Sequence, residues 1–169
     1  MMRKLFCFLL LTVMLVCTLS GCDSSVPQPE IKEGEFHFSV TYEFNGEEKT
    51  VSGVYVCTYT GTSWSLDGGP HRSWKGYIKD GKVEEMFEIG TTENGEKVEL
   101  DLGLCPEYFM DDFVEGYHEI PKPCLSVRLV DDEGISFLYE PSEVEELCGA
   151  KIISYEYDEP IQNVFIISN

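Results

Sequence analysis

Apolar and polar side chains alternate along a segment that begins at Glu35, and this pattern limits the fold more than any other feature of the sequence. In residues 35–44, EFHFSVTYEF, every second position holds phenylalanine, valine or tyrosine. Successive side chains of a β-strand point to opposite faces, so this segment has one apolar and one polar face. Asn45-Gly46, the strongest short signal for a hairpin turn, follows directly. The pattern predicts an amphipathic strand, a turn and a return strand over residues 49–60.

Further strand patterns continue to the end of the chain. They lie at residues 74–79, 82–89, 97–102, 125–129, 135–139, 151–157 and 161–168. Asp80-Gly81 between the first two of these predicts a second hairpin, and Asn94-Gly95 predicts a third turn. The return strand 49–60 carries apolar groups on both faces, which suits a central position in a sheet.

Two short helices interrupt the strand patterns. Residues 141–149, PSEVEELCG, are the clearest, because Ser142 and Glu145 fit a capping box and Gly149 fits the C-terminal cap. Residues 106–113 are the second candidate. We therefore expect a mainly β fold with one or two short helices. An antiparallel β-sandwich is the first choice, and an open or half-barrel sheet wrapped on a helix is the alternative.

The first 22 residues have the organisation of an export signal. Arg3 and Lys4 precede an apolar run over residues 5–19, which is shorter than the roughly 20 residues that a membrane-spanning helix needs. The residues Leu19-Ser-Gly-Cys22 resemble the lipobox of bacterial lipoproteins. This resemblance implies that the Cys22 thiol receives a diacylglycerol and that signal peptidase II cuts just before it. The alternative is a conventional signal peptide that leaves Cys22 as a stray thiol.

The domain organisation follows from these two patterns. We expect a signal peptide over residues 1–21, a lipidated tether over 22–34 and a single mainly β domain over 35–169. The tether is polar and contains prolines, with few groups to bury. The predicted location is the cell membrane, with the domain lipid-anchored and facing outside the cytoplasm.

The charge of the chain limits its partners. It has 31 acidic and 12 basic residues and a net charge of −19, and loss of Arg3 and Lys4 with the signal makes the mature protein more negative. Such a surface repels nucleic acid and anionic headgroups, so we expect no nucleic-acid partner. The acidity also suits a well-solvated exported protein.

Signatures of catalysis and of metal binding are missing from the sequence. It contains no glycine-rich phosphate loop, no G-x-S-x-G and no H-E-x-x-H. Glu107, Asp111 and Glu115 are spaced four apart, which on a helix gives either a solvated face or a weak cation site. We expect no enzyme activity, no cofactor and no metal.

Four cysteines follow Cys22, and export permits disulfides among them. Cys105 and Cys124 lie at loop edges beside prolines and are the candidate disulfide pair. Cys57 and Cys148 suit buried positions as small apolar side chains.

The stretch SWSLDGGPHRSWKGY, residues 63–77, is the candidate binding surface. It holds both tryptophans of the chain next to several cations, a combination that stacks on sugars or grips acidic peptides. The candidate residues are Trp64, His71, Arg72, Trp74 and Lys75. The alternative is a structural loop with one or both tryptophans in the core.

Two segments within residues 42–78, YEFNGEEKTVSGVYVCTYTGTSW and LDGGPHRSWKGYI, are similar to small lipoproteins of Gram-positive anaerobic bacteria. That resemblance implies an envelope location and assigns no catalytic or ligand residue. We expect a binding or interaction module with an envelope protein or glycan as partner. The alternatives are an envelope enzyme or accessory subunit, and a carrier of a lipid or other small molecule.

Overall fold

The computed structural model describes residues 26–66, 69–81, 83–112, 122–131 and 134–167. The lipidation candidate Cys22 and the predicted signal peptide lie outside these ranges. The described strands are β1 (Gln28–Pro29), β2 (Glu33–Phe44), β3 (Glu47–Ser65), β4 (Gly69–Ile78), β5 (Met86–Thr91), β6 (Lys97–Asp101), β7 (Cys124–Asp131), β8 (Gly134–Leu138), β9 (Lys151–Tyr157) and β10 (Phe165–Ile166). The described helices are α2 (Pro106–Phe109) and α3 (Pro141–Cys148). None of them is long and apolar enough to cross a membrane.

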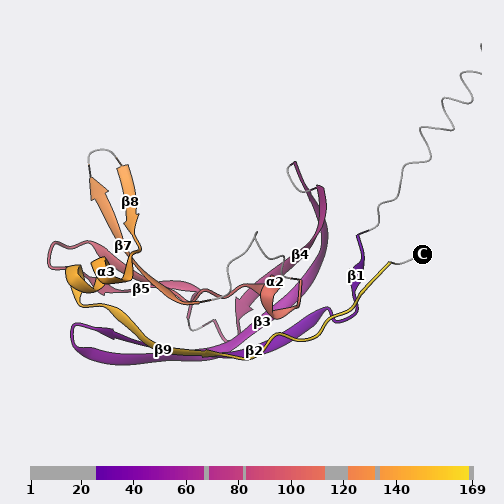
Figure 1. Ribbon diagram of the computed structural model, residues 1–169, viewed down its shortest axis with the longest axis horizontal. Coiled ribbons are helices and arrows are strands. Elements are labelled where there is room, and N and C mark those ends of the chain that lie inside the picture. The colour runs from indigo at the N-terminus through magenta and orange to yellow at the C-terminus, as the bar shows by residue number, and fades with distance from the viewer. Residues whose placement is uncertain (1–25, 67–68, 82, 113–121, 132–133, 168–169) are drawn as a thin grey trace, which may run out of the picture.

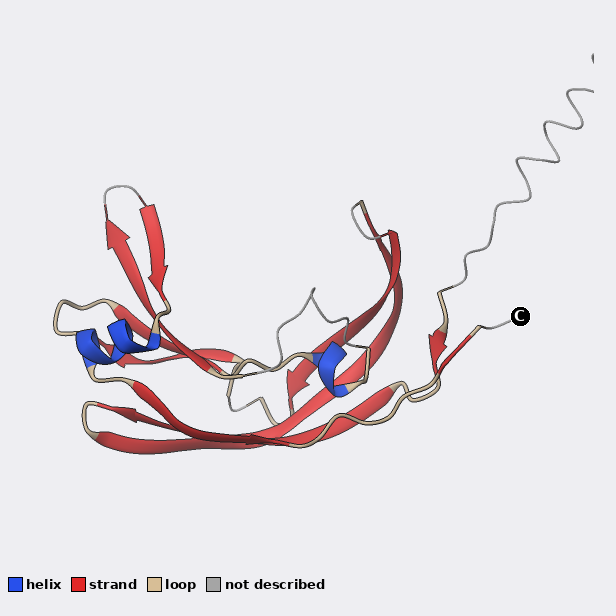
Figure 2. Ribbon diagram, viewed as in Figure 1, coloured by secondary structure: helices blue, strands red, loops and turns tan. Residues whose placement is uncertain are grey.

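Two four-stranded antiparallel sheets form a sandwich-like body, which confirms the mainly β prediction. The long sheet has the order β4-β3-β2-β9 and the short sheet the order β5-β6-β7-β8, while β1 pairs with β10. Figure 1 shows the short sheet stacked over the end of the long sheet that carries α3. Toward the other end the long sheet is covered by α2 and curls upward into the β3–β4 hairpin, as the coloured elements of Figure 2 make clear.

The alternating pattern of β2 fills the core between the layers. Phe36, Phe38, Val40, Tyr42 and Phe44 are all buried, as the spacing of two predicts. The residues packed with them come from β3, both helices and the short sheet: Tyr55, Cys57, Val98, Leu100, Phe109, Leu125, Val127 and Val144. Strand β3 pairs with β2 on one side and β4 on the other, so the central position predicted from its two apolar faces is confirmed.

Two large core rings lie directly over glycines of other strands, one in the same sheet and one in the opposite sheet. A Cβ atom added at Gly76 of β4 would stand 1.7 Å from the Tyr55 hydroxyl oxygen, and one at Gly90 of β5 would stand 2.2 Å from the Phe44 ring. Both distances are far below van der Waals contact, so these positions need glycine to let the aromatic side chains pack.

The connection through Asp80-Gly81 differs from the prediction. We expected a hairpin there, but β4 belongs to the long sheet and β5 to the short sheet, so this turn passes the chain between layers. Asn45-Gly46 does form the predicted turn, with both residues at positive φ. The local dipeptide specifies a turn and leaves open which strands it joins.

The helices also differ in detail from the prediction. Helix α2 ends at Phe109, four residues before the expected end. Helix α3 starts with Pro141 after Glu140, with no side-chain cap, so the capping box of Ser142 and Glu145 is not formed. Gly149 ends α3 in the left-handed conformation, as predicted.

The two ends of the described chain lie together. Strand β10 covers only Phe165–Ile166 of the predicted strand 161–168, and its partner is β1, which lies in the predicted tether. The amide of Glu30 donates to the Val164 carbonyl at 2.8 Å, and the Asn163 side chain bonds both the amide and the carbonyl of Ile31. Residues 28–34, which the sequence assigned to the tether, therefore belong to the fold.

Candidate functional site

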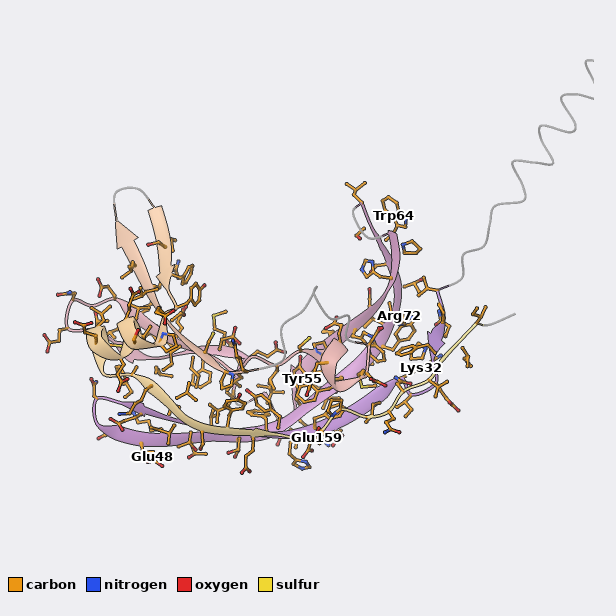
Figure 3. All side chains as sticks on the ribbon, viewed as in Figure 1. Lys32, Glu48, Tyr55, Trp64, Arg72 and Glu159 are labelled. Carbon is orange, nitrogen blue, oxygen red and sulfur yellow. The ribbon has the colours of Figure 1, made fainter. Side chains whose placement is uncertain are left out.

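The stretch 63–77 is strand for most of its length and forms the outer part of the β3–β4 hairpin. Trp64 pairs with Pro70 near the tip and Trp74 pairs with Tyr59 nearer the body, with a register shift at Thr60 between them. Trp64 is 65% exposed and Trp74 is 9% exposed. The structure therefore separates the two tryptophans, one on the surface and one in the core, and Figure 3 shows Trp64 close to the tip, beyond Arg72.

Trp74 is fixed by a carboxylate and by an aromatic ring. Its indole Nε1 donates to Asp112 Oδ2 at 2.7 Å, and its ring meets Tyr59 edge-on with centroids 5.3 Å apart. A buried indole needs such an acceptor, because an unpaired N–H in the interior is costly. Trp74 therefore packs in the core, which was the alternative reading of this stretch, and Trp64 is the exposed tryptophan of the candidate surface.

Arg72 also bonds inside the molecule. Its guanidinium pairs with both oxygens of the Asp112 carboxylate, with Nε 2.8 Å from Oδ2. Another nitrogen donates to the Pro27 carbonyl at 3.2 Å, and the cation lies 4.0 Å from the centre of the Phe165 ring. The bond to Asp112 raises the pKa of Arg72 above its ordinary value. Arg72 therefore ties the hairpin to β1 and β10 at the two ends of the described chain.

The other face of the hairpin carries a serine–histidine pair. Ser63 Oγ lies 2.9 Å from His71 Nε2 and also contacts Ser73 Oγ, while His71 Nδ1 lies 3.2 Å from the Gly69 carbonyl oxygen. A proton on Nδ1 would leave Nε2 to accept from Ser63, the order found in nucleophile–base pairs. The pair is exposed and lines neither of the two hollows described below. Lys75, the last candidate, is exposed beside Trp74.

The cysteines of the described chain are all free thiols, so the candidate Cys105–Cys124 disulfide is not formed. The Cys105 thiol donates to Glu107 at 3.4 Å, and the Cys148 thiol donates to the Val144 carbonyl. Cys57 is fully buried, and burial raises the pKa of its thiol to about 12. Its predicted role as a small core side chain is confirmed.

The described acidic side chains near α2 each have a different hydrogen-bond partner. Asp112 pairs with Arg72, Asp111 accepts from the Asn163 amide at 3.2 Å, and Glu107 accepts from Cys105. Glu115 lies outside the described residues. Across the described part of the chain, no three acidic, histidine or cysteine side chains are grouped so that they could hold a metal ion.

A groove of about 1070 Å³ lies between α3, the start of β7 and the edge strand β9. Its walls are mainly proline, aliphatic and tyrosine side chains, with a few polar groups at the rim. The lining residues are Gly103, Lys122–Leu125, Tyr139, Pro141, Ser142, Val144, Glu145 and Ala150–Tyr155. Lys151 at the rim lies 3.3 Å from Glu145, and the bond to that carboxylate raises the pKa of Lys151.

The groove continues along β9 as an open aromatic strip. Ile153 and Tyr155 of β9 are exposed, and Tyr155 also lines a second hollow of about 590 Å³ with Tyr108 and Tyr157. In the lining of this second hollow, the Asp158 carboxylate accepts hydrogen bonds from the His37 backbone amide at 2.7 Å and from the His37 ring at 2.9 Å. The hydrogen bond from the His37 backbone amide is the main reason why the pKa of Asp158 lies below its ordinary value.

Sequence reasoning missed this groove because its walls come from segments far apart in the chain. The alternation within residues 151–157 indicated a strand, but nothing local showed that β9 would be an edge. The only usable signal was α3, whose apolar face must pack on a neighbouring sheet.

No family model, curated protein or solved structure matches the chain. The roles of the groove and of the hairpin must therefore be inferred from their own geometry.

Proposed function

We propose that this protein is a lipid-anchored, extracytoplasmic binding module that takes an extended polypeptide segment along β9, in the groove beneath α3. The observation that carries the proposal is the open outer edge of β9 where it lines an apolar groove. The anchor rests on the lipobox at Cys22 and the apolar signal before it.

The edge of β9 can supply main-chain hydrogen bonds to a partner. β9 pairs with β2 on one side, and no described backbone hydrogen bond outside the sheet ladders involves residues 151–157. A strand at a sheet edge exposes a row of N–H and C=O groups, and an added peptide strand satisfies them. Affinity then comes from the backbone, and specificity comes from pockets for alternate side chains.

The groove supplies such pockets. Ile153 and Tyr155 are exposed on the strand itself, while Val144 of α3 and Leu125 of β7 form apolar walls. Burial of a partner's aliphatic or aromatic side chain there gains about 25 cal/mol per Å² of apolar surface. The long side chains at the mouth, Lys151 and Glu145, form an ion pair that fixes the rim.

β9 also has features that limit pairing between copies of the protein. The register with β2 shifts at Thr41/Tyr42, which leaves Ile153 without a partner residue, and Lys151 places a charge at the strand's start. Bulges and lysines are common protections of edge strands. A partner must therefore fit this irregular edge, which favours a specific segment over any exposed strand.

A carrier of an apolar small molecule is the second candidate function. The groove volume of about 1070 Å³ is near the upper end of ordinary small-molecule sites, which measure roughly 300–1,000 Å³. In this case the contacts would be to the apolar walls and would leave the β9 backbone edge unpaired.

The test is a photo-cross-linking experiment in intact cells of the source organism. A photoreactive tyrosine analogue replaces Tyr155 in the full-length protein, and the same analogue at Tyr77 is the control. Both tyrosines are 48% exposed, and they lie on the two opposite edge strands of the long sheet. We expect a polypeptide adduct at position 155 and none at position 77.

The variant Ile153→Lys should abolish the adduct at position 155 while leaving the melting temperature unchanged, because Ile153 is already exposed. A small-molecule adduct at position 155 would favour the carrier. Equal labelling at both positions, or none at position 155, would contradict binding in the groove.

A further inference from the structure

We infer that the end of the molecule formed by the β3–β4 hairpin tip and the paired chain ends β1 and β10 is a membrane-contacting surface that enters the lipid headgroup region beside the anchor. The inference rests on the proposed lipidation of Cys22. It adds a second hold on the membrane and a fixed orientation of the domain, which lipidation alone does not provide.

The short tether brings this end to the bilayer. Gln28 pairs with Ile166, Pro29 is buried, and the Pro27 carbonyl accepts from Arg72. Only residues 23–27 therefore separate Cys22 from the fixed part of the chain. A fully extended chain of that length spans roughly 20 Å, so the β1–β10 end cannot move far from the lipid.

The hairpin tip lies at the same end as the chain exit. Arg72 contacts both Pro27 and Phe165, and its partner across the hairpin is Thr62. Trp64 lies two residues further toward the tip, which is about 7 Å along a strand. Figure 1 shows the outer ends of β3 and β4 on the same side of the molecule as β1, far from α3.

This end exposes apolar side chains from three separate segments. Trp64 is 65% exposed and Leu66 is 89% exposed at the hairpin, and Ile167 is 64% exposed after β10. Ile31, Val164 and Ile166 add to them. Tryptophan favours the boundary between headgroups and acyl chains, since its ring is apolar and its N–H needs a polar partner.

The distribution of charge favours a lipid surface over a polar partner. Residues 49–79, which include the hairpin, hold one acidic residue, Asp67, and residues 160–169 hold no charged residue, in a chain with 31 acidic residues. Among the described residues, Glu30, Asp111 and Asp112 are carboxylates near this end, and Asp112 is neutralised by Arg72. Anionic lipids repel the rest of the surface, so electrostatics turn the acid-poor end toward the membrane.

The consequence is a fixed direction for the groove. With the hairpin end in the headgroups, β9 and α3 lie at the other end of the long axis of the molecule (Figure 1). The groove would then face away from the membrane, where an envelope partner can reach it.

The test uses tryptophan fluorescence of the full-length, lipidated protein in vesicles of phosphatidylethanolamine and phosphatidylglycerol that contain brominated lipid as quencher. Trp74→Phe leaves Trp64 as the reporter. We expect a blue shift and quenching of its emission on reconstitution. Loss of the Trp74–Asp112 hydrogen bond can weaken the fold of the Trp74→Phe variant. A second variant, Trp64→Phe, therefore keeps this bond and leaves Trp74 as the only tryptophan. The emission of Trp74 should be unquenched, since Trp74 is buried.

A matched control moves the reporter along the same hairpin. Tyr77→Trp in the Trp64→Phe background places an exposed indole on β4 near the body, and we expect no quenching there. Quenching at position 77 equal to that at position 64 would overturn the inference. The inference would also be overturned if the emission of Trp64 stayed unquenched in vesicles that hold the protein.

The mass of the N-terminal peptide tests the lipid anchor at Cys22 independently of the quenching of Trp64. If Cys22 carries a diacylglyceryl group and Trp64 is unquenched, the lipid anchor stands and the membrane-contacting surface is contradicted. If Cys22 carries no lipid, both the anchor and the membrane-contacting surface are contradicted.

Discussion

Asp112 connects three parts of the molecule through one carboxylate. It binds the Arg72 guanidinium and the Trp74 indole, and through Arg72 it reaches the Pro27 carbonyl. The Asp112 side chain is only 8% exposed, so water cannot replace these partners. The cation and the indole that sequence reasoning assigned to ligand binding are thus held by one acidic residue.

Asp112→Ala should lower the free energy of unfolding by about 3 kcal/mol, because removal of one partner of a buried pair leaves the other charge uncompensated. Urea denaturation followed by circular dichroism measures this loss. Lys75→Ala is the control, since Lys75 is exposed next to Trp74, and we expect a change within about 0.5 kcal/mol. A loss at Asp112 no larger than that at Lys75 would show that the network contributes little.

The long hairpin is the element on which the proposed membrane-contacting surface depends. β3 runs from Glu47 to Ser65, well past the predicted end at Thr60, because a bulge at Thr60 lets pairing with β4 continue to the tip. The same two strands therefore serve the core near the body and the surface near the tip. Tyr55 anchors the core part by packing across Gly76.

Gly76→Ala should lower the free energy of unfolding by about 1–3 kcal/mol, the usual cost of overpacking a core. The added methyl would overlap the Tyr55 ring and hydroxyl. Adding Tyr55→Leu removes the ring, so the two losses should be less than additive in a double-mutant cycle. Ser73→Ala on the same strand is the control. A fully additive cycle would mean that the Tyr55–Gly76 contact does not determine the cost.

At the scale of the whole molecule, the two proposed surfaces lie toward opposite ends of the long axis. The paired strands β1 and β10 and the outer ends of β3 and β4 are at one end, and α3, which lines the groove, is at the other (Figure 1). Such a layout suits a module held at a membrane that receives a partner from the envelope side.

Cys22→Ala in the full-length protein should either release the domain from the membrane fraction or leave the signal peptide uncleaved, because the lipid and the cleavage site both depend on this thiol. Cell fractionation and the mass of the N-terminal peptide measure the two outcomes. Cys148→Ala, a change of a partly buried thiol in α3, should alter neither. A cleaved Cys22→Ala protein that stays in the membrane fraction would contradict the lipid anchor.

The sequence alone predicted the features that depend on local spacing. The period of two in β2 specified which side chains are buried, Asn45-Gly46 placed a turn, and Gly149 ended α3. The expected lipid anchor at Cys22 is also a local inference, and it stays a prediction. Neighbouring residues suffice for these features, since strand alternation and turn conformation are set within a few positions.

Only the tertiary structure decided which tryptophan is core and which is surface. Trp64 and Trp74 lie on the same hairpin, and they differ because Asp112, 38 residues beyond Trp74, meets only one of them. The groove, the edge position of β9 and the docking of residues 28–34 on the C-terminal segment likewise depend on contacts between distant segments. Such contacts are selected by packing of the whole chain, so the spacing of residues within one segment does not encode them.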